Sequence, residues 1–294
     1  MFKSKFVLAV SLLVVAMALV VVGCGPDEEV VAEGVEEVGV LYEGARIGLV
    51  VPTYVDIDSI LDLNDHVDEF GGQIIGIDPG AGIMAATEDA IVEYDLQLSL
   101  LEGSDAAMTA ELDATIANEE WIVVTGWAPH WKFAEWDLKF LEDPELVYGE
   151  EEYIANVARP GFADDYPEVH EFLQNFHWGP EEIGAVMALN KEDDDFIGNS
   201  RSWIAENQDL VDSWIPEGLE GDGAEIEILM VEWECATASS YTAAAILEDA
   251  GYNVTVTPVD AGVMWSSVAE GDADFFVTAW LPGTHAAYWE EFGS

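Results

Sequence analysis

Positively charged side chains are scarce in this sequence. Its 294 residues include 8 Lys plus Arg against 60 Asp plus Glu, a formal net charge of -52. Such a chain is repelled by phosphate backbones and anionic lipids, so nucleic acid and anionic membrane surfaces are excluded as binding partners. Because the acidic excess is spread over the whole chain, we expect a halophilic source, in which salt screens the self-repulsion. An ordinary acidic secreted protein is the weaker alternative.

Cysteine is nearly absent too, and one of the two cysteines ends a segment with the features of a secretion signal. Lys3 and Lys5 precede an apolar run at 6–22, which leads into Val21-Val22-Gly23-Cys24. The pattern resembles a bacterial lipoprotein signal peptide at 1–23 followed by a lipidated Cys24, with an uncleaved membrane anchor as the alternative. Either reading places the folded part outside the cytoplasm. We expect a lipid anchor on the outer face of the cytoplasmic membrane or in the periplasm, and Cys235 is left without a disulfide partner.

Motifs for metals and nucleotides are also missing. The histidines at 66, 170 and 177 have no metal-ligand spacing, and the acidic runs 150–152 and 192–195 lack the spacing of an EF-hand and read as solvated charge. The glycine-rich turn at 78–84 has neither the lysine of a P-loop nor the spacing of a dinucleotide fingerprint. The sequence therefore predicts no metal, no cofactor and no catalytic residue.

Tryptophan, by contrast, is abundant and recurs at one kind of position. Three short apolar runs, 122–127, 228–233 and 275–280, each end in an indole, at Trp127, Trp233 and Trp280. Each run reads as a buried strand, and ligands of open α/β sheets bind beyond the carboxyl ends of the strands. The three indoles could thus converge on one aromatic box, which suits a quaternary ammonium ion. The other tryptophans, and His130, are expected to serve packing or structural hydrogen bonds.

The order of predicted elements indicates an α/β protein with two lobes and a ligand cleft between them. Strand and helix signals alternate up to about residue 140, residues 153–214 read as mainly helical, and a βαβ pattern returns at 225–278. The predicted division is an acidic tether at 24–44 with order beginning near Ala45, one lobe made of 45–54 and 150–294, and a second lobe made of 55–149. A helix is expected at 57–63 with Asp58 as its cap.

The turn at 78–84 leads from a predicted strand into a predicted helix. Such a turn exposes backbone N–H groups at the positive end of a helix dipole, where a small carboxylate fits. Glycines that only permit a tight turn are an equally good explanation of this segment taken alone.

Five motifs together resemble the substrate-binding proteins of glycine betaine and proline betaine ABC importers. They are 74–84 (IIGIDPGAGIM), 124–131 (VTGWAPHW), 137–144 (DLKFLEDP), 260–265 (DAGVMW) and 279–285 (AWLPGTH). The resemblance extends from about Tyr42 to the carboxyl terminus. In many members the part like 225–292 precedes the part like 42–54, so the segment order here looks circularly permuted.

The resemblance implies a periplasmic-binding-protein fold of the type II-like, Venus-flytrap kind, and a set of ligand-binding residues. Trp127, Trp233 and Trp280 would surround the trimethylammonium group, while the N–H groups of Gly82 and Ile83 and the side chain of His285 would hold the carboxylate. It also implies an osmoprotectant receptor, here expected to be a monomer, that delivers its ligand to a membrane permease with an ATPase subunit. Glu234-Cys235-Ala236 follows Trp233 where many members have Asp-Ser-Glu, so the contacts at this position are expected to differ.

Three alternatives to a betaine receptor are open. A choline or carnitine receptor would use the same fold and the same indoles. A carbohydrate-binding protein would stack sugar rings on them, although the strand ends are poor in Asn, Gln and Arg. An enzyme could pair Cys235 with His285 as nucleophile and base, but no third orienting residue is apparent, and we therefore expect no enzymatic activity.

Overall fold

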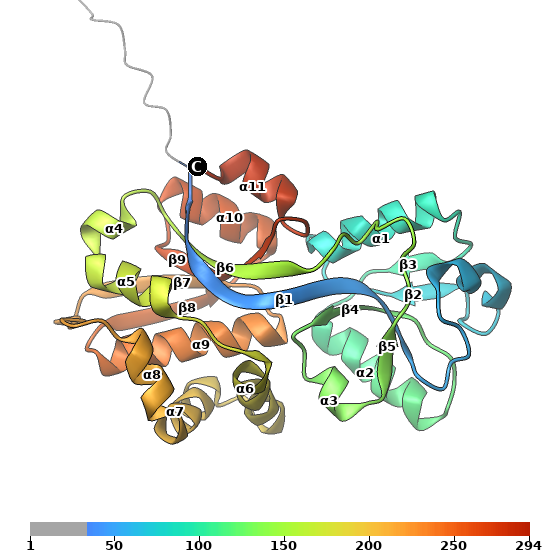
Figure 1. Cartoon of the computed structure of the whole chain (residues 1–294), viewed down its shortest axis with the longest axis horizontal. Coiled ribbons are helices and arrows are strands. Elements are labelled where there is room, and N and C mark those ends of the chain that lie inside the picture. The colour runs from blue at the N-terminus through green and yellow to red at the C-terminus, as the bar shows by residue number, and fades with distance from the viewer. Residues whose placement is uncertain (1–33) are drawn as a thin grey trace, which may run out of the picture. The chain divides into compact units, whose positions relative to one another are not determined.

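The structure is a computed structural model that describes residues 34–294 (Figure 1). The predicted signal peptide, Cys24 and the beginning of the predicted tether lie outside the described residues. Among residues 34–294, no helix combines the length and the apolar character needed to cross a bilayer.

The described residues form a mixed nine-stranded sheet flanked by helices. Its strand order is β3-β2-β4-β1-β6-β9-β7-β8, and β5 pairs with β1 beside this path. The strands are β1 (Glu36–Pro52), β2 (Gln73–Ile75), β3 (Ser99–Leu101), β4 (Val124–Ala128), β5 (Leu138–Phe140), β6 (Glu152–Ala158), β7 (Glu225–Met230), β8 (Asn253–Pro258) and β9 (Phe275–Leu281).

The long strand β1 runs through both halves of this sheet (Figure 1). Its first part, Glu36–Ala45, pairs with β6, whereas Arg46–Val50 pairs with β4 and Val50–Pro52 pairs with β5. We call β2 to β5, the second part of β1 and their helices the β4 half. The first part of β1, β6 to β9 and their helices form the β9 half.

Helices of the β4 half follow its parallel strands. They are the 3-10 helix η1 (Ile60–His66), α1 (Gly82–Glu93), α2 (Asp105–Ala117) and the short α3 (Lys132–Glu135). The strands β2, β3 and β4 are parallel to one another, so α1 and α2 both begin beyond the carboxyl ends of strands. The amino termini of these helices therefore face the edge where a ligand is expected.

The β9 half carries the larger set of helices. They are α4 (Phe162–Asp165), α5 (Pro167–Asn175), α6 (Pro180–Glu192), α7 (Phe196–Glu206), α8 (Gln208–Trp214), α9 (Glu234–Asp249), α10 (Ala261–Glu270) and α11 (Ala286–Phe292). Trp178, Trp203 and Trp214 pack edge to face or stacked within this region and are buried. The prediction that these indoles serve packing is confirmed.

The predicted tether is shorter than expected, because β1 begins at Glu36 and not near Ala45. Its acidic residues alternate with Val38, Leu41 and Tyr42, which are buried. Because the apolar residues are separated by acidic ones, the segment contains no continuous apolar run that would predict a buried strand. Its acidic composition therefore suggested a linker. Its start lies beside the other end of the chain: the Val35 N–H donates to the Phe292 carbonyl at 2.8 Å. Such proximity is what a circular permutation requires.

Two further expectations were wrong in detail. The segment from residue 153 begins not as helix but as β6, a strand between β1 and β9 that is buried along most of its length. The helix expected at 57–63 is a 3-10 helix at Ile60–His66, and its cap is Ser59, whose hydroxyl accepts from the Leu61 N–H. Both errors arose where short polar residues or mixed sequence weakened the periodic signal.

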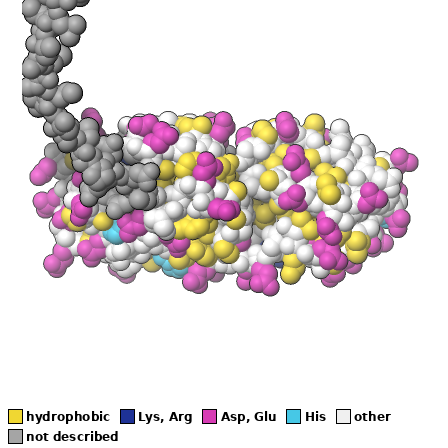
Figure 2. Space-filling model, turned by 90° about the horizontal axis from the view of Figure 1, so that it is seen from above, with side chains coloured by type: hydrophobic (Ala, Val, Ile, Leu, Met, Phe, Trp, Pro, Cys, Tyr) yellow, Lys and Arg dark blue, Asp and Glu magenta, His cyan; other side chains and the backbone are white. Residues whose placement is uncertain are grey.

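Carboxylates are distributed over the visible surface and are not collected in one patch (Figure 2). Within residues 34–294, the surface cations Lys139, Arg159, Lys191 and Arg201 all lie in salt bridges with Asp or Glu. Arg46 and Lys132 instead cover aromatic rings. The surface charge is therefore dominated by unpaired carboxylates.

Candidate functional site

Three indoles from distant parts of the chain line one small space. Trp127 comes from β4, Trp280 from β9, and Trp233 from the residue that precedes α9. Their exposed fractions are 3%, 5% and 2% for Trp127, Trp233 and Trp280, respectively. The ring centroids of Trp127 and Trp233, which belong to different halves, are 6.4 Å apart. We call these three side chains the indole cage.

The space inside the indole cage is small and apolar. It has a volume of about 20 Å³ and is lined by Ile47, Ile77, Ala81, Ile83, Trp127, Trp233, Trp280 and Thr284. A volume of roughly 10–15 Å³ holds a single water molecule, so a small organic cation needs more room than this. Ligand entry therefore requires the indoles to move apart, and the two halves that carry them must separate.

The amino terminus of α1 borders this space. Gly82 and Ile83 are the first two residues of the helix, so their N–H groups have no partner within it. Ala81 is the N-cap and offers no side-chain acceptor. Ile83 lines the space, whereas Gly82 does not. Two free donors at the positive end of the helix dipole can hold a carboxylate.

Gly82 also marks the closest approach of the two halves. A Cβ atom added to Gly82 would lie 2.1 Å from the carbonyl oxygen of Thr284, which belongs to the β9–α11 loop. The Tyr288 hydroxyl in α11 donates across the same boundary to the Gly80 carbonyl at 3.0 Å. The glycine is therefore required by the contact between the two backbones.

His285 is fully buried beside the indole cage and does not line its space. Its Nδ1 accepts from the Trp280 N–H at 3.1 Å, and its backbone N–H donates to the Trp280 carbonyl at 2.9 Å. Burial lowers the pKa of His285 to about 3, so the ring is neutral and its proton is on Nε2. Nε2 has no hydrogen-bond partner among the described residues. An unpaired buried donor of this kind is costly, and an anionic acceptor would satisfy it.

Glu152 holds the loop that carries Thr284 and His285. Its carboxylate accepts from both the N–H and the hydroxyl of Thr284. Glu152 is 5% exposed, whereas its neighbours Glu150 and Glu151 are exposed. The expectation that the whole run 150–152 is solvated charge is thus wrong for Glu152, since this residue opens a buried strand.

An acidic chamber adjoins the indole cage and shares Ala81 and Trp233 with it. It has a volume of about 290 Å³, and its carboxylates are Asp78, Glu232 and Asp260. Burial raises the pKa of Asp78, while a hydrogen bond from the Trp233 side chain opposes that rise. The negative potential of this chamber favours the approach of a cation to the indole cage.

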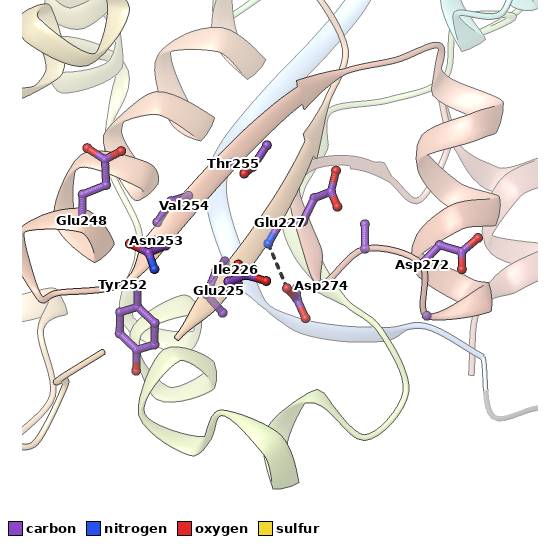
Figure 3. A pocket seen from close by; sticks show the side chains of 12 residues that line it. Glu225, Ile226, Glu227, Glu248, Tyr252, Asn253, Val254, Thr255, Asp272 and Asp274 are labelled. Carbon is purple, nitrogen blue, oxygen red and sulfur yellow. Dashed lines mark hydrogen bonds between the residues drawn. The ribbon is translucent and has the colours of Figure 1, made fainter. Parts of the chain in front are cut away.

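A larger cavity lies far from the indoles, at the amino ends of β7 and β8. It has a volume of about 660 Å³ and contains Glu225, Glu227, Glu248, Asp272 and Asp274, with Tyr252 at its side (Figure 3). No indole lines it, and two of its carboxylates are paired with arginines, Asp274 with Arg159 and Glu248 with Arg201. Size alone therefore does not identify the ligand site.

The chain is similar to a family of known proteins. Residues 27–206 and 224–294 match the OpuAC family, the substrate binding domain of ABC-type glycine betaine transport systems. This chain belongs to that family. The glycine betaine/carnitine transport binding protein GbuC of Listeria monocytogenes is 38% identical over 243 residues, which cover 82% of this chain and 80% of the Listeria protein.

Solved structures of family members have the same fold. The glycine betaine, L-proline-binding protein ProX of Borrelia burgdorferi matches with a TM-score of 0.61 and 37% identity, over 63% of this chain and 71% of that chain. Lactococcal OpuAC, in its closed conformation with glycine betaine, matches with a TM-score of 0.58 and 36% identity, over 62% and 71%. The fold is thus the two-lobed α/β fold of periplasmic substrate-binding proteins, and the protein is extracytoplasmic.

The family consists of transport substrate-binding proteins. The Cys235 thiol is fully buried, and this burial raises its pKa to about 12, so it is a poor nucleophile. Its predicted role as a small buried residue agrees with this position. Among residues 34–294, no group of three or more His, Cys, Asp or Glu side chains is arranged to hold a metal ion.

Sequence reasoning missed the residues that support the indole cage. Asp105, Lys132 and Glu152 are buried charged residues near it; the first two were not singled out, and Glu152 was read as solvated charge. His130 was expected to make a structural hydrogen bond, and it does so with Asp105 at 3.0 Å. Lys132 directly follows the Pro-His-Trp turn at 129–131. A single lysine among aromatic residues, in a chain with so few lysines, was the sequence signal that could have identified it.

Proposed function

We propose that this protein captures glycine betaine, or a closely related quaternary ammonium osmoprotectant, in the indole cage and delivers it to an ABC permease. Trp127, Trp233 and Trp280 would contact the trimethylammonium group through their π faces. A quaternary ammonium ion keeps this attraction, whereas an ion that donates hydrogen bonds would lose them inside an apolar space.

The carboxylate of the ligand would bind at the other end of the site. The N–H groups of Gly82 and Ile83 and the Nε2–H of His285 are its proposed donors. The observation that carries the proposal is the meeting of three buried indoles with a neutral imidazole whose donor is unpaired. A zwitterion with a fixed cation and a carboxylate complements both ends.

The two halves would act as the lobes of a receptor that closes on its ligand. The strand pairing supports assigning 46–52 to the lobe that contains 55–149, and 34–45 to the lobe that contains 150–294. Because each half supplies part of the indole cage, a bound betaine would stabilise the closed arrangement. The closed monomer would then be recognised by the permease and its ATPase partner.

We also propose that Cys24 carries a lipid that holds the protein at the membrane, after removal of the signal peptide at 1–23. The support is the sequence Val21-Val22-Gly23-Cys24 after an apolar run. Metabolic labelling with a radioactive fatty acid tests it, and the Cys24→Ala variant should lose the label.

Carnitine is a second candidate ligand. The related Listeria protein is described as a glycine betaine/carnitine binding protein. The chamber of about 290 Å³ beside Trp233 could accept a zwitterion longer than glycine betaine once the halves separate. A tenfold preference for carnitine in a direct competition would make it the better assignment.

Calorimetric titration with three compounds tests the proposed site. Glycine betaine carries both ligand groups, tetramethylammonium lacks the carboxylate, and glycine has an ammonium that donates hydrogen bonds. We expect strong binding of glycine betaine, much weaker binding of tetramethylammonium and none of glycine. Equal binding of glycine betaine and tetramethylammonium would remove the carboxylate site from the proposal.

A further inference from the structure

A cluster of buried charged and polar groups lies behind the indole cage and does not line its space. Asp105 is 3% exposed, His130 is 5% exposed and Lys132 is fully buried. All three belong to the β4 half. Burial of charged groups is costly unless they are paired, so this cluster needs an account.

The hydrogen bonds of the cluster fix its protonation. The Lys132 backbone N–H donates to His130 Nδ1 at 3.0 Å, so the proton of the neutral ring is on Nε2. Burial lowers the pKa of His130 to about 4, which keeps the ring neutral. His130 Nε2 therefore donates to Asp105 Oδ1 at 3.0 Å. One carboxylate oxygen is thereby satisfied within the β4 half.

The second carboxylate oxygen reaches across to the β9 half. Asp105 Oδ2 accepts from the Glu234 N–H at 3.3 Å. Glu234 is the first residue of α9, and the N-cap of this helix, Trp233, offers no side-chain cap. Asp105 thus acts as the missing cap of α9 from the opposite half. The capped residue directly follows the Trp233 indole of the cage.

Lys132 supplies the positive charge that this arrangement needs. Its ammonium lies 3.9 Å from the ring centroid of Trp127 and has no hydrogen-bond partner among the described residues. Burial would raise the pKa of Asp105, but His130, Lys132 and the Glu234 N–H outweigh it and hold this pKa below its ordinary value. The carboxylate is therefore ionised and accepts at both oxygens.

We propose that Asp105 is a positioning residue that latches the two halves together and sets Trp233 opposite Trp127. The inference rests on the proposed function, because it assigns the residue that holds the closed, ligand-bound arrangement. Opening the halves breaks a charge-assisted hydrogen bond and uncaps α9. The latch therefore slows ligand release and leaves the encounter with the ligand unaffected.

The test removes the latch without leaving a buried charge unpaired. In the Asp105→Asn/Lys132→Met double variant both charges disappear with little change in shape. The two donors meet different oxygens of Asp105, and the amide replaces one of these oxygens with an NH2 group, so either the His130 Nε2–H or the Glu234 N–H would face a donor. We expect the dissociation rate of glycine betaine, measured by stopped-flow fluorescence on the full chain, to rise about tenfold with an unchanged association rate.

Asp274→Asn is the matched control. Asp274 accepts from the Glu227 N–H at 2.9 Å, a bond drawn in Figure 3, and from Arg159 Nε at 3.0 Å. It resembles Asp105 in binding both a backbone N–H and a charged or polar side chain, but all its partners lie in the β9 half. The control should lose thermal stability and keep the wild-type dissociation rate.

Two measurements decide between a latch and a merely structural cluster. If Asp105 served stability alone, the double variant would keep the wild-type dissociation rate, and that result overturns the proposal. Hydrogen exchange of the Glu234 amide in the ligand-free protein gives a second test, with faster exchange expected in the double variant than in Asp274→Asn. Wild-type protein that binds no betaine would contradict the proposed function, and the amide exchange would still decide the latch.

Discussion

The indole cage and the cavity at the β7–β8 edge show how little volume says about a binding site. The cage encloses about 20 Å³ and the cavity about 660 Å³. Two carboxylates of the cavity, Glu248 and Asp274, already have an arginine partner, and no indole lines it. The cage holds buried indoles and lies against a buried imidazole with an unpaired donor, groups that are costly to keep without a ligand. The indole cage, and not the larger cavity, is therefore the proposed ligand site.

A substitution at Gly82 is expected to have the largest effect on ligand binding at the indole cage. The Gly82→Ala variant places a Cβ atom 2.1 Å from the Thr284 carbonyl, and backbone atoms on both sides cannot yield without moving the halves apart. We expect glycine betaine affinity to fall about a hundredfold or more in a calorimetric titration. Gly80→Ala is the control, because no atom lies within 4 Å of a Cβ added there. Wild-type affinity in Gly82→Ala would contradict the closed arrangement.

Removing one indole should have the next largest effect. Trp280→Ala is expected to weaken glycine betaine binding by ~1–2 kcal/mol or more, the range of a desolvated cation-π contact. Tyr252→Ala removes the aromatic side chain of the β7–β8 cavity and should leave the affinity unchanged. Equal affinity of Trp280→Ala and wild-type protein would rule out the cage as the ammonium site.

The burial of His285 predicts how the stability of the protein changes at acid pH. A histidine on the surface would not cause this change. Its folded pKa of about 3 lies below the ordinary value of 6.5, so unfolding takes up a proton between these values. The stability that the neutral ring contributes is present above pH 6.5 and is lost as the pH falls toward 3. We expect wild-type stability to fall more steeply than that of His285→Asn between pH 6 and 5, by about 1.4 kcal/mol per pH unit. Equal slopes in urea titrations would contradict the buried neutral ring.

The affinity for glycine betaine should be constant over the same pH range. The Nε2–H of His285 stays a donor as long as the ring stays neutral, which holds down to about pH 3. A loss of affinity centred near pH 6.5 would contradict this expectation and would be assigned to His285 or to Glu234, since burial raises the pKa of Glu234 to about 7.

Salt is expected to have the smallest effect on binding. It should change the stability of the protein through the surface carboxylates and leave the affinity of the buried site nearly unchanged. The net charge of -52 makes the folded state repel itself, and counter-ions screen this repulsion. We expect the melting temperature to rise as NaCl increases from about 0.05 to about 1 M, because the Debye length falls from above 10 Å to about 3 Å over this range. Glycine betaine affinity should change less than about threefold, because the indole cage is buried. A melting temperature independent of salt would contradict the role assigned to the carboxylates.

The sequence predicted the parts of the fold that have strong local signals. The βαβ pattern at 225–278, the helix that follows the turn at 78–84, and the three indoles at the ends of apolar runs all follow from periodicity and turn residues. β1 from Glu36 and β6 were missed because their burial depends on pairing with strands distant in sequence. Local pattern carries no information on such pairing.

The supporting residues of the site were beyond sequence reasoning for a different reason. Asp105, Lys132 and Glu152 look like ordinary surface charges when read one at a time. Their burial and their contacts with the Glu234 N–H, Trp127 and Thr284 arise only when the two halves come together. In contrast, the indoles were identifiable because each of them ends a short apolar run that reads as a buried strand.

The most direct measurement is the intrinsic tryptophan fluorescence of the full chain in high salt, titrated with glycine betaine, choline and a neutral sugar. The account predicts a saturable change with glycine betaine, a much weaker one with choline and none with the sugar. The change in tryptophan fluorescence would then show that the ammonium group binds at the indoles, and the weaker response to choline would show that the carboxylate contributes to binding. A chain that responds to none of the ammonium compounds, or that responds to the sugar alone, would contradict the account.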